Sequence, residues 1–110
     1  NVATVDMLPL APTSLQSTAQ SSTAVTLTWQ NNQPAVAGLG YDIWQGRPPA
    51  VVGGPITWVQ VGQVGNVNTF INTNLTPDST YYYQVRAFVL NGTKYYFSGW
   101  SNTINANTVP

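Results

Sequence analysis

The sequence contains no cysteine, no histidine and no glutamate, and its 110 residues include only three acidic and three basic side chains. Without cysteine, stability must come from packing rather than from disulfides. A serine nucleophile needs a neighbouring base, and a tight zinc site needs cysteine, histidine or carboxylate ligands. Because these groups are missing or scarce, we expect no enzyme activity, no metal and no cofactor.

Charge is nearly absent, and the formal net charge is zero. Nucleic-acid binding requires several cations to neutralise phosphates, so we expect no nucleic-acid partner. No apolar run reaches the roughly 18 residues that a membrane span needs, so we expect no membrane insertion. A surface with so few charges favours association, which indicates an assembled or extracellular protein. The charged residues are Asp6, Asp42, Arg47, Asp78, Arg86 and Lys94.

The residues that are present favour strands. The chain is 43% hydrophobic, with many β-branched and aromatic residues, and eight prolines and nine glycines punctuate it. Alternating apolar residues between turn residues predict short strands at 15–18, 25–29, 40–44, 58–64, 69–72, 81–90, 94–97 and 101–108. Asn91-Gly92 predicts a tight hairpin, because both central turn positions need φ > 0. The length suits one all-β sandwich.

The stretch LTPDSTYYYQVRA, residues 75–87, fixes the orientation of one strand. By alternation, Tyr81 and Tyr83 point toward the core, and Tyr82 points outward together with Arg86. A Leu-x-Pro just before a strand that opens with tyrosine is typical of a tyrosine corner, in which the phenol hydroxyl bonds to upstream backbone. We therefore expect Tyr81 to close such a corner.

The same stretch resembles the fibronectin type III family, whose pattern here is roughly L-x-P-G-T-x-Y-x-V-x-V-x-A. The resemblance covers about residues 10–110 and is most like the version found in secreted prokaryotic proteins. It implies a seven-stranded immunoglobulin-like β-sandwich of fibronectin type III topology, with sheets A-B-E and G-F-C-C′ in the family's lettering. Further family marks follow in order along the chain: Pro12, Leu15, Trp29, Tyr41, Ile43 and the stretch 98–101.

The resemblance also places the strand at 40–44 antiparallel to the strand at 81–90. Asp42 and Trp44 then face outward, with Trp44 near Tyr82 and Asp42 near Arg86. We predict an aromatic patch of Trp44 and Tyr82, extended by Trp58, that binds a partner protein or a glycan. The alternative is cross-strand pairing that only stabilises the sheet. We also expect the Arg86 guanidinium to stack on Trp100. This stack either binds a ligand or is structural and holds the last strand against the strand at 81–90.

Residues 1–9 form an extension or linker strand before the domain at 10–110. Three readings stay open for this segment: the tail of a preceding domain in a tandem array, a strand that pairs with a neighbouring subunit, and a mobile terminus. The second reading assigns assembly to the apolar side chains Val2, Val5, Met7 and Leu8. The role of the long loop at 46–57 stays open.

Asn74 and Asn91 each begin an N-glycosylation pattern, which has meaning only in a secreted protein. The sequence as a whole favours a non-catalytic extracellular or cell-surface module, a spacer or adhesion domain whose partners are other protein domains or copies of itself. Two alternatives are a structural subunit of an extracellular filament that assembles by N-terminal strand exchange, and an accessory module of a polysaccharide-degrading enzyme. Fold similarity alone does not choose among them.

Overall fold

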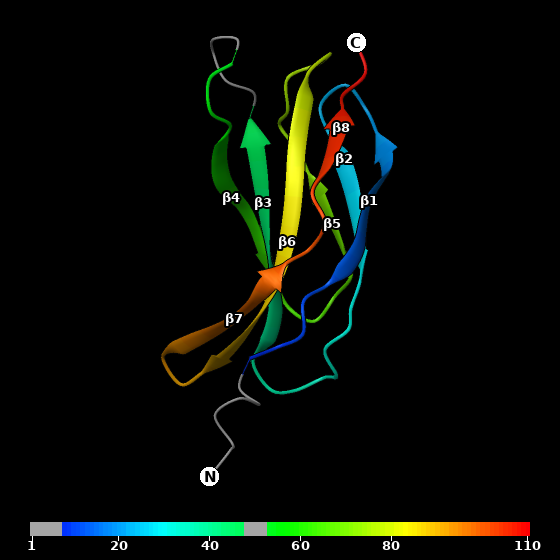
Figure 1. Ribbon diagram of the computed structural model, residues 1–110. Helices are drawn as coiled ribbons and strands as arrows, with labels where there is room; N and C mark the ends of the chain where they lie inside the picture. Colours follow the sequence, from blue (N-terminus) through cyan, green and yellow to red (C-terminus); the bar gives the residue numbers. More distant parts are fainter. Residues whose placement is uncertain (1–7, 48–52) are drawn as a thin grey trace.

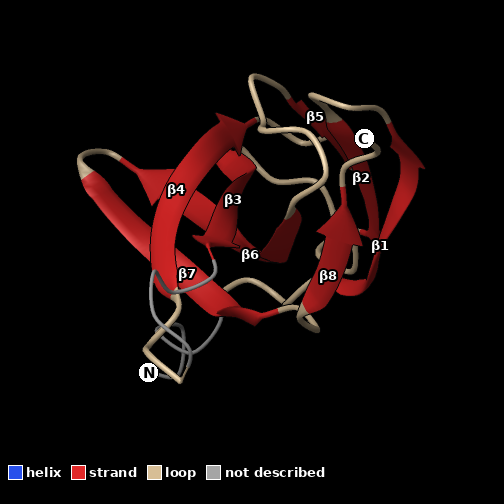
Figure 2. Cartoon of the chain, turned by 90° about the horizontal axis from the view of Figure 1, so that it is seen from above, coloured by secondary structure: helices blue, strands red, loops and turns tan. Residues whose placement is uncertain are grey.

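The computed structural model describes residues 8–47 and 53–110, which form eight strands in two packed sheets (Figure 1). None of these residues is helical, so none lies in a helix able to cross a membrane. Viewed from above, the sheets enclose a common interior (Figure 2). The strands are β1 Thr13–Gln20, β2 Val25–Gln30, β3 Leu39–Arg47, β4 Thr57–Val64, β5 Thr69–Asn72, β6 Thr80–Asn91, β7 Lys94–Trp100 and β8 Ile104–Asn107.

One sheet has the order β1-β2-β5 and the other has the order β4-β3-β6-β7, with β8 also paired to β6. All pairs are antiparallel. The predicted sandwich and its two sheets are therefore confirmed. The last strand of the sandwich is divided in two, because β7 pairs with the second half of β6 and β8 pairs with the first half.

Two serines bridge the place where the last strand is divided. Ser98 Oγ accepts a hydrogen bond from the backbone N–H of Ala87 at 2.8 Å, and Ser101 Oγ accepts one from Val85 N–H at 2.9 Å. These hydroxyls satisfy backbone donors in the middle of β6 that a regular strand would otherwise have to pair. The chain can therefore bend between β7 and β8 without leaving those N–H groups unpaired.

The core lies between the sheets and follows the predicted alternation. Tyr81, Tyr83, Val85 and Ala87 of β6 are all buried, while the residues between them are half-buried. The Tyr81 hydroxyl accepts a hydrogen bond from Thr76 N–H at 2.9 Å, which confirms the tyrosine corner. The other buried hydrophobic residues of the core are Leu15, Val25, Leu27, Trp29, Leu39, Tyr41, Ile43, Leu75 and Ala106.

The hairpin after β6 is present, but its turn lies one residue later than predicted. Asn91 pairs with Lys94 and belongs to the strand, so the two turn residues are Gly92 and Thr93. Only Gly92 of these two has positive φ, at 66°. This is the pattern of a turn that needs φ > 0 at its first central position alone, whereas Asn-Gly was expected to fill both.

A side chain joins the two sheets at the edge beside β1. Asn102, in the bend between β7 and β8, donates a hydrogen bond to Leu15 C=O at 3.0 Å and accepts one from Leu15 N–H at 2.8 Å. One carboxamide therefore satisfies both backbone groups of a buried residue, as a paired strand would. It also holds β1 of the three-stranded sheet beside the last part of the chain.

Candidate functional site

The predicted binding residues lie on the outer surface of the five-stranded sheet. Gly46 of β3 stands between Tyr82 of β6 and Trp58 of β4 in the strand register, and the Trp58 ring covers it. Trp44 is opposite Gln84, two residue pairs further along and therefore in the next row on this surface. The structure thus brings Trp58 and Tyr82 to one row of the sheet and sets Trp44 in the next row. All three side chains are half-buried.

Trp44 contacts Trp100 rather than Tyr82. Its ring centroid lies 6.0 Å from that of Trp100, with an edge-to-face angle of 83°. The Arg86 guanidinium lies among three rings, with its Cζ 3.8 Å from the Phe97 centroid, 4.7 Å from Trp100 and 5.8 Å from Trp44. The predicted stack of Arg86 on Trp100 is therefore present within a larger cluster. This cluster holds β7 against β6 and β3.

Asp42 lies on the same surface, as predicted. Its side chain, however, is covered and not open to solvent. Its side chain is only 2% exposed, because neighbours on both sides cover it. Arg86 forms an ion pair with Asp42 Oδ2 at 3.3 Å, and Gln60 and Gln63 donate hydrogen bonds to Oδ1 at 3.3 and 3.0 Å. The predicted contact between Asp42 and Arg86 is thus present. It forms the base of the aromatic cluster rather than part of an open binding surface.

The most exposed aromatic side chains lie on β7. Of these residues, only Trp100 was singled out from the sequence. Tyr95, Phe97 and Trp100 are 40%, 36% and 41% exposed. The rings of Tyr95 and Phe97 are stacked, 5.8 Å apart and 10° from parallel. These three side chains share the outer surface with the residues predicted from the sequence. We name the whole set the aromatic face: Trp44, Trp58, Tyr82, Tyr95, Phe97 and Trp100.

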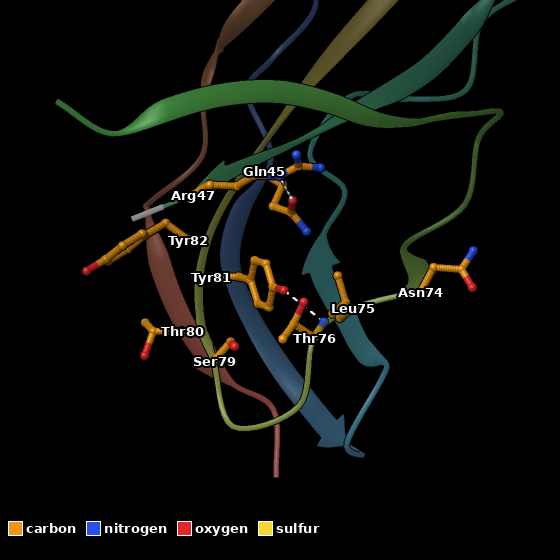
Figure 3. Close-up of a pocket in the computed structure, with 9 residues that line it drawn as sticks. All are labelled: Gln45, Arg47, Asn74, Leu75, Thr76, Ser79, Thr80, Tyr81 and Tyr82. Carbon is orange, nitrogen blue, oxygen red and sulfur yellow. Dashed lines mark hydrogen bonds between the residues drawn. The ribbon is translucent and has the colours of Figure 1, made fainter. Parts of the chain in front are cut away.

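A second candidate site is a hollow of about 790 Å³ at the end of the sandwich where the C-terminus lies (Figures 1 and 3). The end of β3, the segment between β5 and β6 and the start of β6 border it. Arg47 lies across one side of it, and Tyr82 and Asn74 stand at opposite rims (Figure 3). Its lining residues are Gln45, Arg47, Asn74, Leu75, Thr76, Ser79, Thr80, Tyr81 and Tyr82.

A chain of buried polar groups leads inward from this hollow. Arg47 Nε donates to Gln45 Oε1 at 2.8 Å, and Gln45 Nε2 donates to the Tyr83 hydroxyl at 3.3 Å. Asn72 Nδ2 donates to the same hydroxyl at 2.9 Å. Burial raises the pKa of the Tyr83 phenol above its ordinary 10.0, although these hydrogen bonds and the positive charge of Arg47 oppose the rise. The phenol is therefore a neutral acceptor at neutral pH.

The remaining predicted residues are exposed or lie outside the described chain. Leu8, Asn74 and Asn91 are exposed. Val2, Val5 and Met7 fall outside the described residues, as does the part of the predicted 46–57 loop at 48–52. Within 8–47 and 53–110, no three histidine, cysteine, aspartate or glutamate side chains gather as metal ligands.

Comparisons with known proteins agree with this architecture. The fibronectin type III domain model matches residues 10–105. No curated protein matches the chain. A solved structure described as a myokine has a TM-score of 0.66 and 16% identity, covering 93% of this chain and 99% of its own. The fibronectin type III domain of human fibronectin type III domain containing protein 3 has a TM-score of 0.64 and 20% identity, covering 94% and 85%. Domains A168–A170 of titin have a TM-score of 0.65 and 20% identity, covering 94% of this chain and 33% of that one.

Proposed function

Because the chain belongs to the fibronectin type III domain family, we propose that it is a non-catalytic module that binds other protein domains through the aromatic face. Domains of this family are common structural and interaction modules that occur in tandem arrays, and they are generally non-catalytic and typically extracellular. We place this chain in that setting, as an extracellular or cell-surface spacer or adhesion domain. Residues 10–110 form the module and residues 1–9 its linker.

One observation carries the proposal. Tyr95, Phe97 and Trp100 keep more than a third of their surface exposed while lying side by side on an edge strand. Single exposed aromatic residues are ordinary, whereas a contiguous group marks an interaction surface. Aromatic side chains supply large contact area at a low cost in conformational entropy, and they are enriched in protein interfaces.

Site-specific photo-cross-linking in the producing cells tests the proposal. A benzophenone amino acid at position 97 should form a cross-link to a defined protein or to a second copy of the chain. The matched control is position 71 on β5, where Ile71 is 58% exposed but belongs to the other sheet. Cross-links to the same protein at equal yield from both positions, or from position 71 alone, would contradict a binding role for the aromatic face.

Assembly into filaments is a second candidate. Among the described strands β7 ends the order of its sheet, and it has one charged residue, Lys94, so this edge carries little of the charge that normally prevents strand addition. Leu8 is exposed and follows Val2, Val5 and Met7 in the sequence. We propose that this segment pairs with a neighbouring subunit. Light scattering and negative-stain microscopy check this: fibres that disappear when residues 1–8 are deleted support it, and fibres that survive the deletion refute it.

Glycan contact is a third candidate, as in an accessory module of a polysaccharide-degrading enzyme. Trp58 and Tyr82 flank Gly46 in one row, and the Trp58 ring and the Ile56 side chain fill the space over this glycine, so two aromatic side chains lie on either side of β3. Trp44→Ala removes the third predicted ring, and unchanged glycan binding in that variant would remove Trp44 from the contact. Asn74 and Asn91 are both exposed. Mass spectrometry of the protein secreted from its host checks whether these two proposed positions are glycosylated.

A further inference from the structure

We propose that the hollow at the end of β3 binds an acidic sugar, with the Arg47 guanidinium pairing with the carboxylate of the sugar. This inference rests on the hollow, which shares Tyr82 with the aromatic face, and it does not depend on the protein-binding role proposed for that face. Three observations carry it: the state of Arg47, the way in which Arg47 is held, and the polar groups around it.

Among the described residues, no carboxylate compensates the charge of Arg47. Within residues 8–47 and 53–110 the ion pair present is that of Arg86 with Asp42, and no described carboxylate reaches Arg47. Its Nε–H is used by Gln45, and no described residue accepts a hydrogen bond from its two terminal nitrogens. Those nitrogens retain N–H groups on one side of a planar fork. A carboxylate accepts two parallel hydrogen bonds from such a fork.

The guanidinium is held in place by buried groups rather than by solvent. Gln45, which accepts from Arg47, is only 1% exposed. The carboxamide of Gln45 is fixed in turn by the Tyr83 hydroxyl, and Asn72 fixes that hydroxyl from the other side. A cation oriented before the ligand arrives loses less conformational entropy on binding. Of these three buried side chains only Gln45 contacts Arg47, and Tyr83 and Asn72 fix the carboxamide of Gln45 behind it.

The lining of the hollow matches a ligand with many hydroxyl groups. Five of its nine lining side chains carry a hydroxyl group: Thr76, Ser79, Thr80, Tyr81 and Tyr82. The Thr76 and Tyr82 hydroxyls and the Asn74 carboxamide form no side-chain hydrogen bond with a described residue. Arg47 and Thr76 lie on opposite sides of the hollow, while Tyr82 and Asn74 stand at its rims and point outward (Figure 3).

An acidic peptide matches the lining less well. The aliphatic side chain in the lining is Leu75, which is buried as part of the core. The apolar side chains of a bound peptide would therefore meet hydroxyl groups, whereas sugar hydroxyls can exchange hydrogen bonds with them. One cation with neutral polar neighbours also suits a single carboxylate better than a densely sulfated chain, which needs several cations.

Calorimetric titration with trigalacturonate tests the proposal. The wild-type protein should bind it, and the fully methyl-esterified trisaccharide, which keeps the rings but lacks the charge, should bind about tenfold more weakly or worse. Arg47→Gln should weaken binding of the free acid by a similar factor. Lys94→Gln is the matched control, because it removes another exposed cation at the far hairpin and should leave binding unchanged.

Four results would overturn the proposal. The first is that the wild type does not bind trigalacturonate, and the second is that it binds the methyl ester equally well. The third is that Arg47→Gln binds the free acid as tightly as the wild type does. The fourth is that an acetylated tetraglutamate peptide binds more tightly than the sugar and in an Arg47-dependent way, because this result would make the ligand a peptide. Thermal unfolding verifies that each variant is folded. If Arg47→Gln does not fold, Arg47→Lys keeps the charge but loses the planar fork, and it should weaken binding several-fold.

Discussion

Replacing Arg86 by methionine would remove the charge beneath the aromatic face while keeping much of the side-chain volume. Arg86 compensates Asp42, whose carboxylate is 2% exposed, and its own side chain is 22% exposed. After the change, Asp42 would retain the hydrogen bonds from Gln60 and Gln63 but would have no cation beside it. A buried charge that has lost its partner is strongly destabilising.

The magnitude follows from two contributions. A hydrogen bond to a charged group contributes about 1.5–3 kcal/mol. The cation–π contact of Arg86 with Phe97, at 3.8 Å, adds about 0.5–2 kcal/mol because the site is partly desolvated. Methionine recovers some of the packing. We therefore expect the free energy of unfolding to fall by about 2–4 kcal/mol, a large part of the roughly 5–15 kcal/mol that holds a typical domain folded.

Urea unfolding measures this loss. With a denaturant slope of about 1–3 kcal/mol/M, the midpoint should fall by about 1–3 M. Lys94→Met is the control, because it removes an exposed cation whose Nζ lies 5.3 Å from the Tyr96 ring, and it should cost less than about 1 kcal/mol. A double-mutant cycle with Asp42→Asn should give a coupling of about 1–2 kcal/mol. Equal losses in Arg86→Met and Lys94→Met, or a coupling near zero, would refute the reasoning and make the pair equivalent to a surface salt bridge.

Three further changes test other parts of the structure. Tyr41→Phe should raise the free energy of unfolding by about 1 kcal/mol, measured in urea, because the buried Tyr41 hydroxyl has no partner among the described residues; a loss of stability would reveal a partner. Burial raises the pKa of Tyr41 and Tyr83 above 10.0 in the fold, so the unfolded chain deprotonates first. Stability should then be complete below about pH 10 and fall as the pH rises through the folded pKa values, and constant urea midpoints from about pH 8 to about pH 11.5 would contradict this. Asn102→Ala should cost about 2–4 kcal/mol in thermal or urea unfolding, because both backbone groups of the buried Leu15 lose their partner, and a loss below about 1 kcal/mol would show that water replaces the carboxamide.

The elements that could be predicted are those whose signal is local. The period-2 alternation from Tyr81 to Ala87 assigns each side chain to one side of the sheet, and the corner follows from a tyrosine a few residues after Leu75. Both features are fixed within about a dozen residues, so neighbouring strands do not alter them. The hairpin turn was predicted one residue too early, because Asn91-Gly92 and Gly92-Thr93 each supply a glycine to a two-residue turn.

The burial of Asp42 could not be predicted in the same way. Alternation places Asp42 on the outer surface correctly, but its exposure depends on Gln60, Gln63 and Arg86, which come from two other strands. A register shift between Ile43 and Trp44 in the pairing of β3 with β4 decides which glutamines reach it. The hollow at Arg47 escaped prediction for a similar reason, because its lining comes from both 45–47 and 74–82.

The Arg86 cluster explains why the aromatic residues lie where they do, but it does not explain why they remain exposed. Arg86 needs only one side of Phe97 and of Trp100, and Asp42 is already covered by glutamines. Tyr95 does not contact the guanidinium; it packs edge-to-face on Phe88 and stacks on Phe97. Stability therefore accounts for the inner surfaces of these rings. Their outer surfaces lie on an edge strand with a single charge at its beginning, and this combination favours a partner protein over solvent as their natural neighbour.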